Sequence, residues 1–329
     1  MQALAVVLLV IASVVVGLAM RFLGLEFIWG GQKLTTNDND TTQGLSSGLK
    51  ATLADAIGWR MLRVLGKVPG SVSGLTVTML GGFVVLALTL PIVVVIVISF
   101  SRASFLTFPP PGFSLRWYVR FFSNSDWMTA FGTSVLVAVL SSAMSVLIGA
   151  SATMAIVRSD FKGKSLVMTA LVSPMIVPPV VLGLSLYAYM LHLHLVGTVW
   201  GVAMAHSVAG LPLVVVIVSS ALQSVDQRQE LAASVHGASP WRVFLHVTLP
   251  AMAPGLSAAA FFAFLQSFDE LVLSLFLAGS SITLLPLCLW ADINYQLNPV
   301  LAVVSTIEVV LVIVGISFAR KTLAGRAQS

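Results

Sequence analysis

Long apolar runs dominate this sequence and restrict the folds open to it. Because backbone polar groups in lipid must be satisfied internally, runs long enough to cross a hydrocarbon core of roughly 30 Å predict transmembrane helices. Only 9% of the 329 residues are charged, against roughly 25% in soluble domains. We therefore predict an all-α, polytopic membrane protein. The candidate spans lie at residues 2–20, 79–100, 131–157, 165–191, 196–222, 251–278 and 299–319.

The basic residues are divided unequally between the segments that join these runs. When the segments are assigned to alternate sides, 14 of the 17 Lys and Arg residues fall on one side and only Arg102, Arg116 and Arg120 on the other. The positive-inside rule makes the richer side cytoplasmic. The C-terminus and residues 223–250 are then cytoplasmic. The net charge of +5 follows from this asymmetry, so we expect membrane lipid, and no nucleic acid, around the chain.

The beginning of the chain differs from the rest. Residues 1–31 hold the first apolar run and its tail, and no basic residue precedes that run, so we expect an extra span with its N-terminus outside and not a cleaved leader. Residues 32–75 hold a polar linker and then apolar residues at helical spacing, which predict an interfacial amphipathic helix. More linker is the alternative there. Residues 76–329 contain the other six spans.

A polar island (residues 223–250) separates two of the spans. Asp226 is placed to cap a helix, and Glu230 lies in the first turns, where a negative charge favours the helix dipole. Gly237 can take the left-handed conformation that ends helices, and Pro240 is tolerated in the first turn of the next one. The pattern predicts a short helix, a sharp turn and a second short helix that returns to the membrane.

Two adjacent acids, Asp269 and Glu270, lie inside the run at 251–278. A charged residue at the centre of a span costs roughly 2.5–3.5 kcal/mol on insertion scales. The pair is expected to face a water-filled path, where negative charge would favour a cationic amine. Hydrogen bonds to neighbouring helices, or a break in the span, are equally open alternatives. Glu308 and His206 are solitary intramembrane residues, and we expect structural roles for both.

Three prolines interrupt the run at 165–191. Pro174, Pro178 and Pro179 remove backbone donors and clash with the preceding turn, so they predict a bend. Such a bend can serve either a translocation path or helix packing.

Three short motifs follow one another in the polar island: Glu230-Leu231-Ala232-Ala233, Gly237-Ala238 and Thr248-Leu249-Pro250. They resemble the EAA loop of ABC importer permeases, whose short coupling helix fits a groove on the ATP-binding subunit. The resemblance implies that Glu230, Ala232, Ala233, Gly237 and Ala238 couple to the ATPase. Leu231 stands where the motif usually has glutamate, and Glu230 points about 100° away from that position.

Further motifs lie along the six-span region: Phe113 to Tyr118, Phe264 to Glu270, and Pro299 to Ile307. They resemble the second permease subunit of spermidine/putrescine importers, over roughly residues 75–320. The resemblance implies a type I, MetI-like six-helix core and a polyamine such as spermidine or putrescine as solute. It places Ser267, Phe268, Asp269 and Glu270 on the substrate path. An importer of another small organic solute, such as an amino acid derivative or a phosphonate, is the alternative.

The same resemblance implies a bacterial inner-membrane assembly. Its other members are ATP-binding ABC subunits, a second permease subunit and a periplasmic solute-binding protein. Residues 2–31 resemble the last span and tail of the first permease subunit, so we expect an origin in a fused pair of permeases.

Chemistry that the sequence lacks points the same way. Gly163-Lys164-Ser165 does not end a phosphate-binding loop, because Arg158 stands where that motif needs glycine. The common hydrolase and metal-binding motifs are absent, and Cys288 is the only cysteine. We expect no catalytic residue, metal or cofactor in this chain, with ATP and Mg bound by the partner ATPase.

Two other function classes remain open. An ion-gradient-driven secondary transporter would use Asp269, Glu270 and Glu308 as proton or sodium sites, and its uptake would survive ATP depletion. A membrane scaffold would carry no solute at all.

Overall fold

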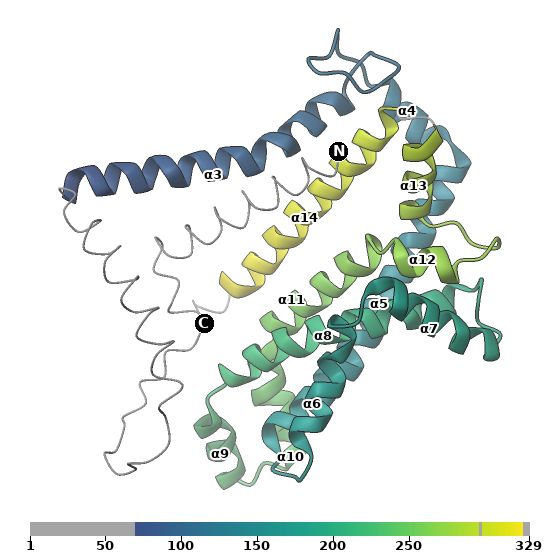
Figure 1. Cartoon of the computed structure of the whole chain (residues 1–329). Helices are drawn as coiled ribbons and strands as arrows, with labels where there is room; N and C mark the ends of the chain where they lie inside the picture. Colours follow the sequence, from purple (N-terminus) through teal and green to yellow (C-terminus); the bar gives the residue numbers. More distant parts are fainter. Residues whose placement is uncertain (1–69, 296–297, 325–329) are drawn as a thin grey trace, which may run out of the picture. The chain divides into compact units, whose positions relative to one another are not determined.

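The computed structural model describes residues 70–295 and 298–324, and it is helical over most of that length (Figure 1). The predicted N-terminal span at residues 2–20 lies outside the described residues. So does most of the predicted linker and amphipathic helix at 32–75. The domain boundaries proposed for this part of the chain stay predictions.

The chain divides into two compact units, residues 1–93 and 94–329, and each is described by itself. Helix α3 (Gly70–Ser99) runs through the boundary and contains Pro91. The remaining helices of the described residues belong to the second unit.

Five helices of the described part are long and apolar enough to cross a membrane. Together with a bent helix pair, they correspond to the six apolar runs that follow residue 78. The prediction of an all-helical polytopic protein is confirmed. The five stretches are Gly81–Ser99, Ser125–Arg158, Val199–Gln223, Pro240–Phe268 and Val300–Ser317.

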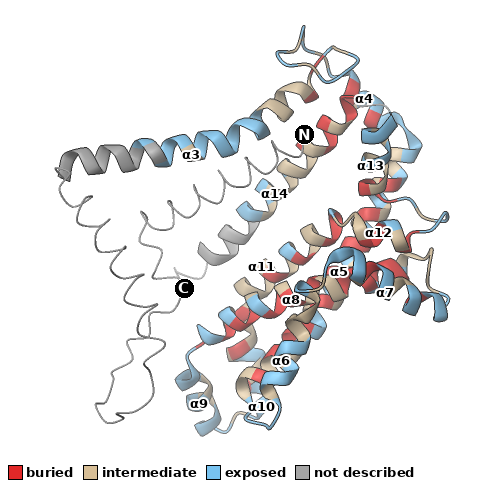
Figure 2. Cartoon of the chain, viewed as in Figure 1, coloured by how far each residue is buried: buried red, intermediate tan, exposed pale blue. Residues whose placement is uncertain are grey.

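Three long helices pack along one another in the second unit: α5 (Ser125–Arg158), α8 (Val199–Gln223) and α11 (Leu249–Phe268). Small residues allow helices to approach closely in a membrane. At Gly149 of α5, an added Cβ would lie only 2.8 Å from a methyl carbon of Val214 on α8. Figure 2 shows buried residues concentrated along these helices.

The prolines bend the chain as predicted. The run at 165–191 forms α6 (Lys164–Val172), a 3-10 turn (Ser173–Met175) and α7 (Pro179–His192), and the two helical parts meet at 104°. The predicted bend is therefore present as a break between two helices. The cause is local, because Pro178 is extended, with φ −56° and ψ 135°, and cannot continue the preceding turn.

The run at 251–278 is also interrupted. Helix α11 ends at Phe268, and a separate helix, α12 (Val272–Leu277), begins after Asp269 and Glu270. The predicted alternative of a break in the span is present, because neither acid lies within a continuous helix. The alternative of a water-filled path stays a prediction. A charged pair beside the start of a helix is less costly than one inside a regular span, because the free backbone N–H groups of the first turn can donate hydrogen bonds to a carboxylate.

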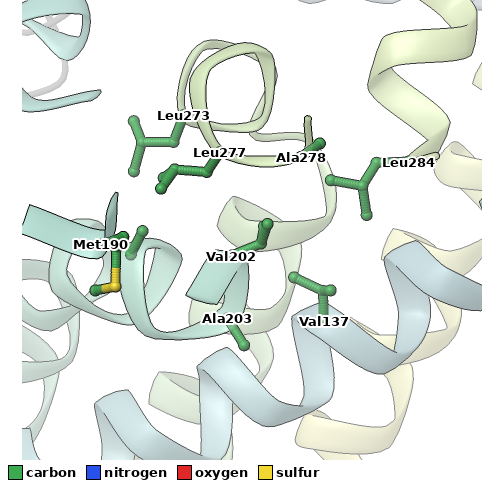
Figure 3. Close-up of a cluster of buried hydrophobic side chains, with 9 residues drawn as sticks. Val137, Met190, Val202, Ala203, Leu273, Leu277, Ala278 and Leu284 are labelled. Carbon is green, nitrogen blue, oxygen red and sulfur yellow. The ribbon is translucent and has the colours of Figure 1, made fainter. Parts of the chain in front are cut away.

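Helix α12 is held in place by a buried apolar cluster (Figure 3). Leu273 and Leu277 of α12 lie near Met190 of α7, Val202 of α8 and Val137 of α5. All five side chains are almost completely buried. The cluster thus joins the two broken spans to the central helices.

One end of the second unit is built around α4 (Arg116–Ser123). This helix lies beside α14 (Val300–Ala324) and the N-terminal end of α5, and the short helix α13 (Leu285–Tyr295) contacts α5 nearby. Trp117 and Phe121 of α4 are buried there. The helix is therefore amphipathic, with Trp117 and Phe121 on its buried face. We call this region the α4 end.

The opposite end carries the polar island. It contains α9 (Gln227–Val235), α10 (Pro240–Val243) and a π-helical turn (Phe244–Thr248) that leads directly into α11. The 34 residues of α5 separate the two ends by about 50 Å, at 1.5 Å per residue. We call this region the α9 end (Figure 1).

Candidate coupling loop and solute path

Helix α9 begins where the sequence predicts. The backbone N–H of Arg228 donates to Asp226 Oδ1 at 2.9 Å, so the Asp226 carboxylate caps the helix. The second predicted helix is present as α10, but it is only one turn long and continues through the π-helical turn into the membrane span. The polar island is thus a capped helix followed by a turn and a direct return to the bilayer.

The turn after α9 depends on Gly237. Its φ of +82° lies in the left-handed region, which favours glycine because a Cβ would be strained there. The N–H of Gly237 donates to Ser234 O at 3.0 Å, and the N–H of Ala238 donates to Ala233 O at 3.1 Å. This pair of bonds is a Schellman motif. It gives Gly237, Ala233 and Ala238 a shared role in ending the helix.

Glu230 is turned toward the protein. Its Oε1 accepts from Arg158 Nη2 at 2.9 Å and from Thr248 Oγ1 at 2.7 Å, and its side chain is only 19% exposed. Arg158 ends α5, and Thr248 lies directly before α11. We name these three residues the Glu230 clasp. The clasp joins α9 to two spans at once. Sequence reasoning missed it, because Arg158 was considered only as a residue that does not fit a phosphate-binding loop.

The outward face of α9 is apolar where the motif usually carries glutamate. Leu231 is 67% exposed and Val235 is 78% exposed, and residues four apart lie on the same face of a helix. Ala232 is exposed beside them. The clasp and the exposed residues thus occupy different faces, which follows from the 100° step between Glu230 and Leu231.

The predicted path residues divide into two pairs. Ser267 and Phe268 are buried, and the ring of Phe268 packs edge-on against Phe131 and stacks on Phe264. Asp269 is exposed, and Glu270 is half-buried at the break. Only the second pair is placed to meet a solute or water.

A buried polar network holds the break. His206 Nδ1 of α8 lies 2.9 Å from Ser267 Oγ, and its Nε2 lies 3.3 Å from Ser274 Oγ of α12. Ser274 also donates to the carbonyl of Glu270 at 2.6 Å. His206 therefore takes a structural position between α8, α11 and α12, as expected for a solitary intramembrane histidine.

Glu270 has two kinds of contact. Its Oε1 accepts from the N–H groups of Val272 and Leu273, at 3.0 and 3.2 Å, and so caps α12. Glu270 also lines a pocket of about 320 Å³ together with Gln266 and with apolar side chains from both broken spans and from α8. Gln266 was not named as a site residue from the sequence. Its signal was a polar side chain in an apolar run, one helical turn before Glu270. The bend at Pro174 to Pro179 forms one wall of this pocket.

Glu308 of α14 is less isolated than the sequence indicated. Its carboxyl group lies within electrostatic range of Asp269. Among the described residues, no group of three or more His, Cys, Asp and Glu side chains could hold a metal ion.

Comparison with protein families decides what kind of membrane protein this is. The model of the family described as "Binding-protein-dependent transport system inner membrane component" matches residues 145–321, more than half of the chain. The chain belongs to this family. As an ABC importer permease it is a membrane component and not itself an enzyme. The matched region includes both the polar island and the break at Asp269 and Glu270.

Named relatives lie among polyamine permeases. The spermidine/putrescine transport system permease protein PotC of Escherichia coli (strain K12) is 32% identical over 69% of this permease and 86% of its own length. The putrescine transport system permease protein PotI of the same strain is 30% identical over 66% and 79%. The molybdenum transport system permease protein ModB of Haemophilus influenzae is 33% identical over 44% and 68%. The resemblance to polyamine permeases is confirmed.

A solved structure supports the fold. A chain in the crystal structure of a bacterial ABC transporter involved in the import of the acidic polysaccharide alginate superposes with a TM-score of 0.58. The match covers 76% of this permease and 96% of that chain, at 15% sequence identity. At this identity the likeness concerns the fold alone, and it agrees with the MetI-like helical architecture.

Proposed function

We propose that this permease subunit lines the import path for a polyamine such as spermidine or putrescine, and that a separate ATP-binding subunit drives it by docking on α9. The observation that carries the coupling proposal is the Glu230 clasp. A helix fixed to the end of α5 and to the start of α11 cannot be displaced without moving both spans. Force applied to α9 would therefore reach the transmembrane region directly.

The surface of α9 supports docking by another protein. Exposed apolar groups such as Leu231 and Val235 lose contact with water when a partner covers them, at roughly 25 cal/mol per Å² of apolar area. A shallow pocket of about 480 Å³ next to them is lined by Gln227, Arg228 and Ser234, among others. The surface thus offers an apolar ridge with a polar edge, which suits a groove on a soluble partner.

The pocket at the break supports a cationic solute. A carboxylate in a low-dielectric site attracts an ammonium group strongly, and Glu270 with Gln266 supplies the polar groups in an otherwise apolar pocket. Its volume of about 320 Å³ lies at the lower end of the range for small-molecule sites. Relatives named for spermidine and putrescine favour the same class. Another relative is named for molybdenum transport, so an importer of a different small solute is the alternative.

The proposal assigns the remaining parts to partners. A second permease subunit completes the path, a periplasmic solute-binding protein delivers the solute, and the ATPase subunits bind ATP and Mg. The assembly lies in a bacterial inner membrane, with the α9 end and the C-terminus on the cytoplasmic side, as the charge asymmetry favours.

The test is uptake by the assembled transporter. Both permeases and the ATPase are reconstituted in proteoliposomes with the binding protein, and uptake of radiolabelled spermidine is followed. We expect uptake that requires ATP and persists when ionophores dissipate ion gradients. Uptake that survives ATP depletion but fails with ionophores would establish the secondary transporter instead.

The variant Glu270→Gln tests the solute class in the same assay. Glutamine keeps an oxygen that can cap α12 but removes the charge, so we expect the KM for spermidine to rise about 10-fold, equivalent to about 1.4 kcal/mol. Glu308→Gln is the matched control, since it removes one intramembrane charge outside the pocket lining. Equal effects of the two variants would remove Glu270 from the path.

A further inference from the structure

A third pocket, of about 580 Å³, lies at the α4 end. It is lined by Ser104, Arg116, Trp117, Arg120 and Asn298. Two of the three basic residues on the predicted outer side therefore line one pocket. The positive-inside rule does not require any of them there, so their clustering needs another cause.

One of the two guanidinium groups is held in a fixed position. Arg116 Nη2 donates to Ala103 O at 2.7 Å and to Ser104 Oγ at 3.2 Å, and its guanidinium carbon lies 4.5 Å from the ring centre of Trp117. The Trp117 ring is itself buried, and its Nε1 donates to the same Ala103 carbonyl at 3.1 Å. The loop after α3 thus fixes Arg116 and the Trp117 ring together.

The other guanidinium keeps its donors available. Arg120 lies 5.4 Å from the ring centre of Trp117, and among the described residues it has neither a hydrogen bond nor an ion pair. Like charges four residues apart on a helix repel one another. The fold nevertheless keeps Arg116 and Arg120 on the same aromatic ring, and the residues that line the pocket include no carboxylate. The carboxylate of Asp292 accepts from the lining residue Asn298 at 2.8 Å. Five N–H donors on a planar fork match a carboxylate well.

We propose that this arginine pocket receives an acidic side chain of the solute-binding protein when that protein docks on the outer face. The proposal rests on the proposed import function, and the family description itself names binding-protein dependence. A positive pocket would repel a cationic solute arriving alone. It agrees with a solute that arrives inside a carrier whose docking surface is negatively charged.

Charge reversal of Arg120 provides the test. The assembled transporter in nanodiscs is titrated with the fluorescently labelled binding protein of the same system at several salt concentrations. Arg120→Glu should raise the Kd at least 10-fold and weaken the dependence of Kd on salt, because an attractive charge pair is lost. Arg120→Lys should retain part of the affinity, since it keeps the charge without the planar fork.

Arg102→Glu is the matched control, because Arg102 is exposed in the same outer loop but does not line the pocket. We expect its Kd to stay within two-fold of the unaltered transporter. Equal effects of Arg102→Glu and Arg120→Glu would overturn the inference while leaving ATP-driven uptake, and hence the proposed function, intact. An Arg120→Glu variant that binds the carrier normally but loses uptake of a small anion such as molybdate would also overturn it. Absence of any carrier binding by the unaltered transporter would overturn both.

Discussion

Glu230 is the residue through which α9 is joined to the membrane spans. Its carboxylate joins α5 and the start of α11 through Arg158 and Thr248. Both members of the ion pair are less than one quarter exposed, so the pair is screened less by salt than a fully exposed ion pair. Its role follows from this position, because a firmly held helix transmits motion while a loosely held one absorbs it.

Loss of the clasp is expected to uncouple the transporter. Glu230→Gln keeps an acceptor for Thr248 but removes the ion pair, at a cost of about 1–3 kcal/mol. We expect the ATPase to bind normally, with ATP hydrolysed per solute imported rising about 10-fold. The measurement is the ratio of phosphate release to spermidine uptake in proteoliposomes.

The neighbouring ion pair of Lys164 and Asp160 gives the control. It joins residues four apart at 3.7 Å, and Asp160 is fully exposed, so Asp160→Asn should leave the ratio unchanged. If Asp160→Asn uncouples transport as strongly as Glu230→Gln, the clasp has no special function.

The contrast between Glu230 and Asp226 explains what sequence could predict at this scale. Asp226 caps α9 by accepting from an N–H group two residues away, and such local geometry can be predicted from residue type. Glu230 is paired with a residue 72 positions earlier, and no local pattern predicts that contact. His206 and its serines follow the same rule, because three separate helices supply the network.

At the scale of elements, the turn after α9 determines where that helix ends. Gly237 ends the helix with a positive φ, and an added Cβ would meet no atom within 4 Å. A substitution of Gly237 therefore strains the backbone and causes no steric clash. The strain costs about 1–2 kcal/mol of stability.

Gly237→Asp should lower ATPase association at least 10-fold while membrane insertion stays normal, because the strain distorts only the turn and α9. Co-purification of the ATPase with the permease measures the effect. Gly163→Asp is matched to it, since Gly163 also has a positive φ, +96°, and open space around its Cβ, but lies before α6. Unchanged co-purification of Gly237→Asp would remove α9 from the docking surface.

The ends and bends of helices were predictable from the sequence where the conformational preference of one residue type determines them. Prolines fixed the bend of the run at 165–191, and Gly237 fixed the turn. The break after Phe268 was only one of several alternatives, because an acidic pair can be accommodated by a path, a partner or a helix end. Packing of α12 against α7 and α8 holds the break in place, and that packing joins segments remote in sequence.

At the scale of the whole molecule, we expect the two ends of α5 to lie on opposite sides of the membrane. In intact cells, Ser104→Cys at the α4 end should react with a membrane-impermeant maleimide, while Gln229→Cys on α9 should react only after the membrane is opened. Both positions are exposed. The reverse pattern would invert the orientation and place α9 out of reach of any cytoplasmic ATPase.

The natural cysteine, Cys288, should not react with the maleimide in that experiment. Burial, followed by the charges of Asp292 and Asp126, raises the pKa of the Cys288 thiol to about 11. Below that pH the thiol is neutral, so at pH 7 only about one molecule in 10,000 carries the reactive thiolate. Labelling of the unaltered protein should therefore be negligible at pH 7 and increase as the pH approaches 11. Fast labelling at pH 7 would contradict the burial of this side chain.

The π-helical turn at Phe244–Thr248 sets the rotational phase of the span that follows it. Such a turn contains about one residue more than an α-helical turn, and one residue corresponds to about 100° of rotation. Deleting a single residue there would let an unbroken α-helix form, and it would turn either Thr248 away from Glu230 or Gln266 away from its pocket. One extra residue thus keeps the contact between Thr248 and Glu230 and the pocket lined by Gln266 in angular register.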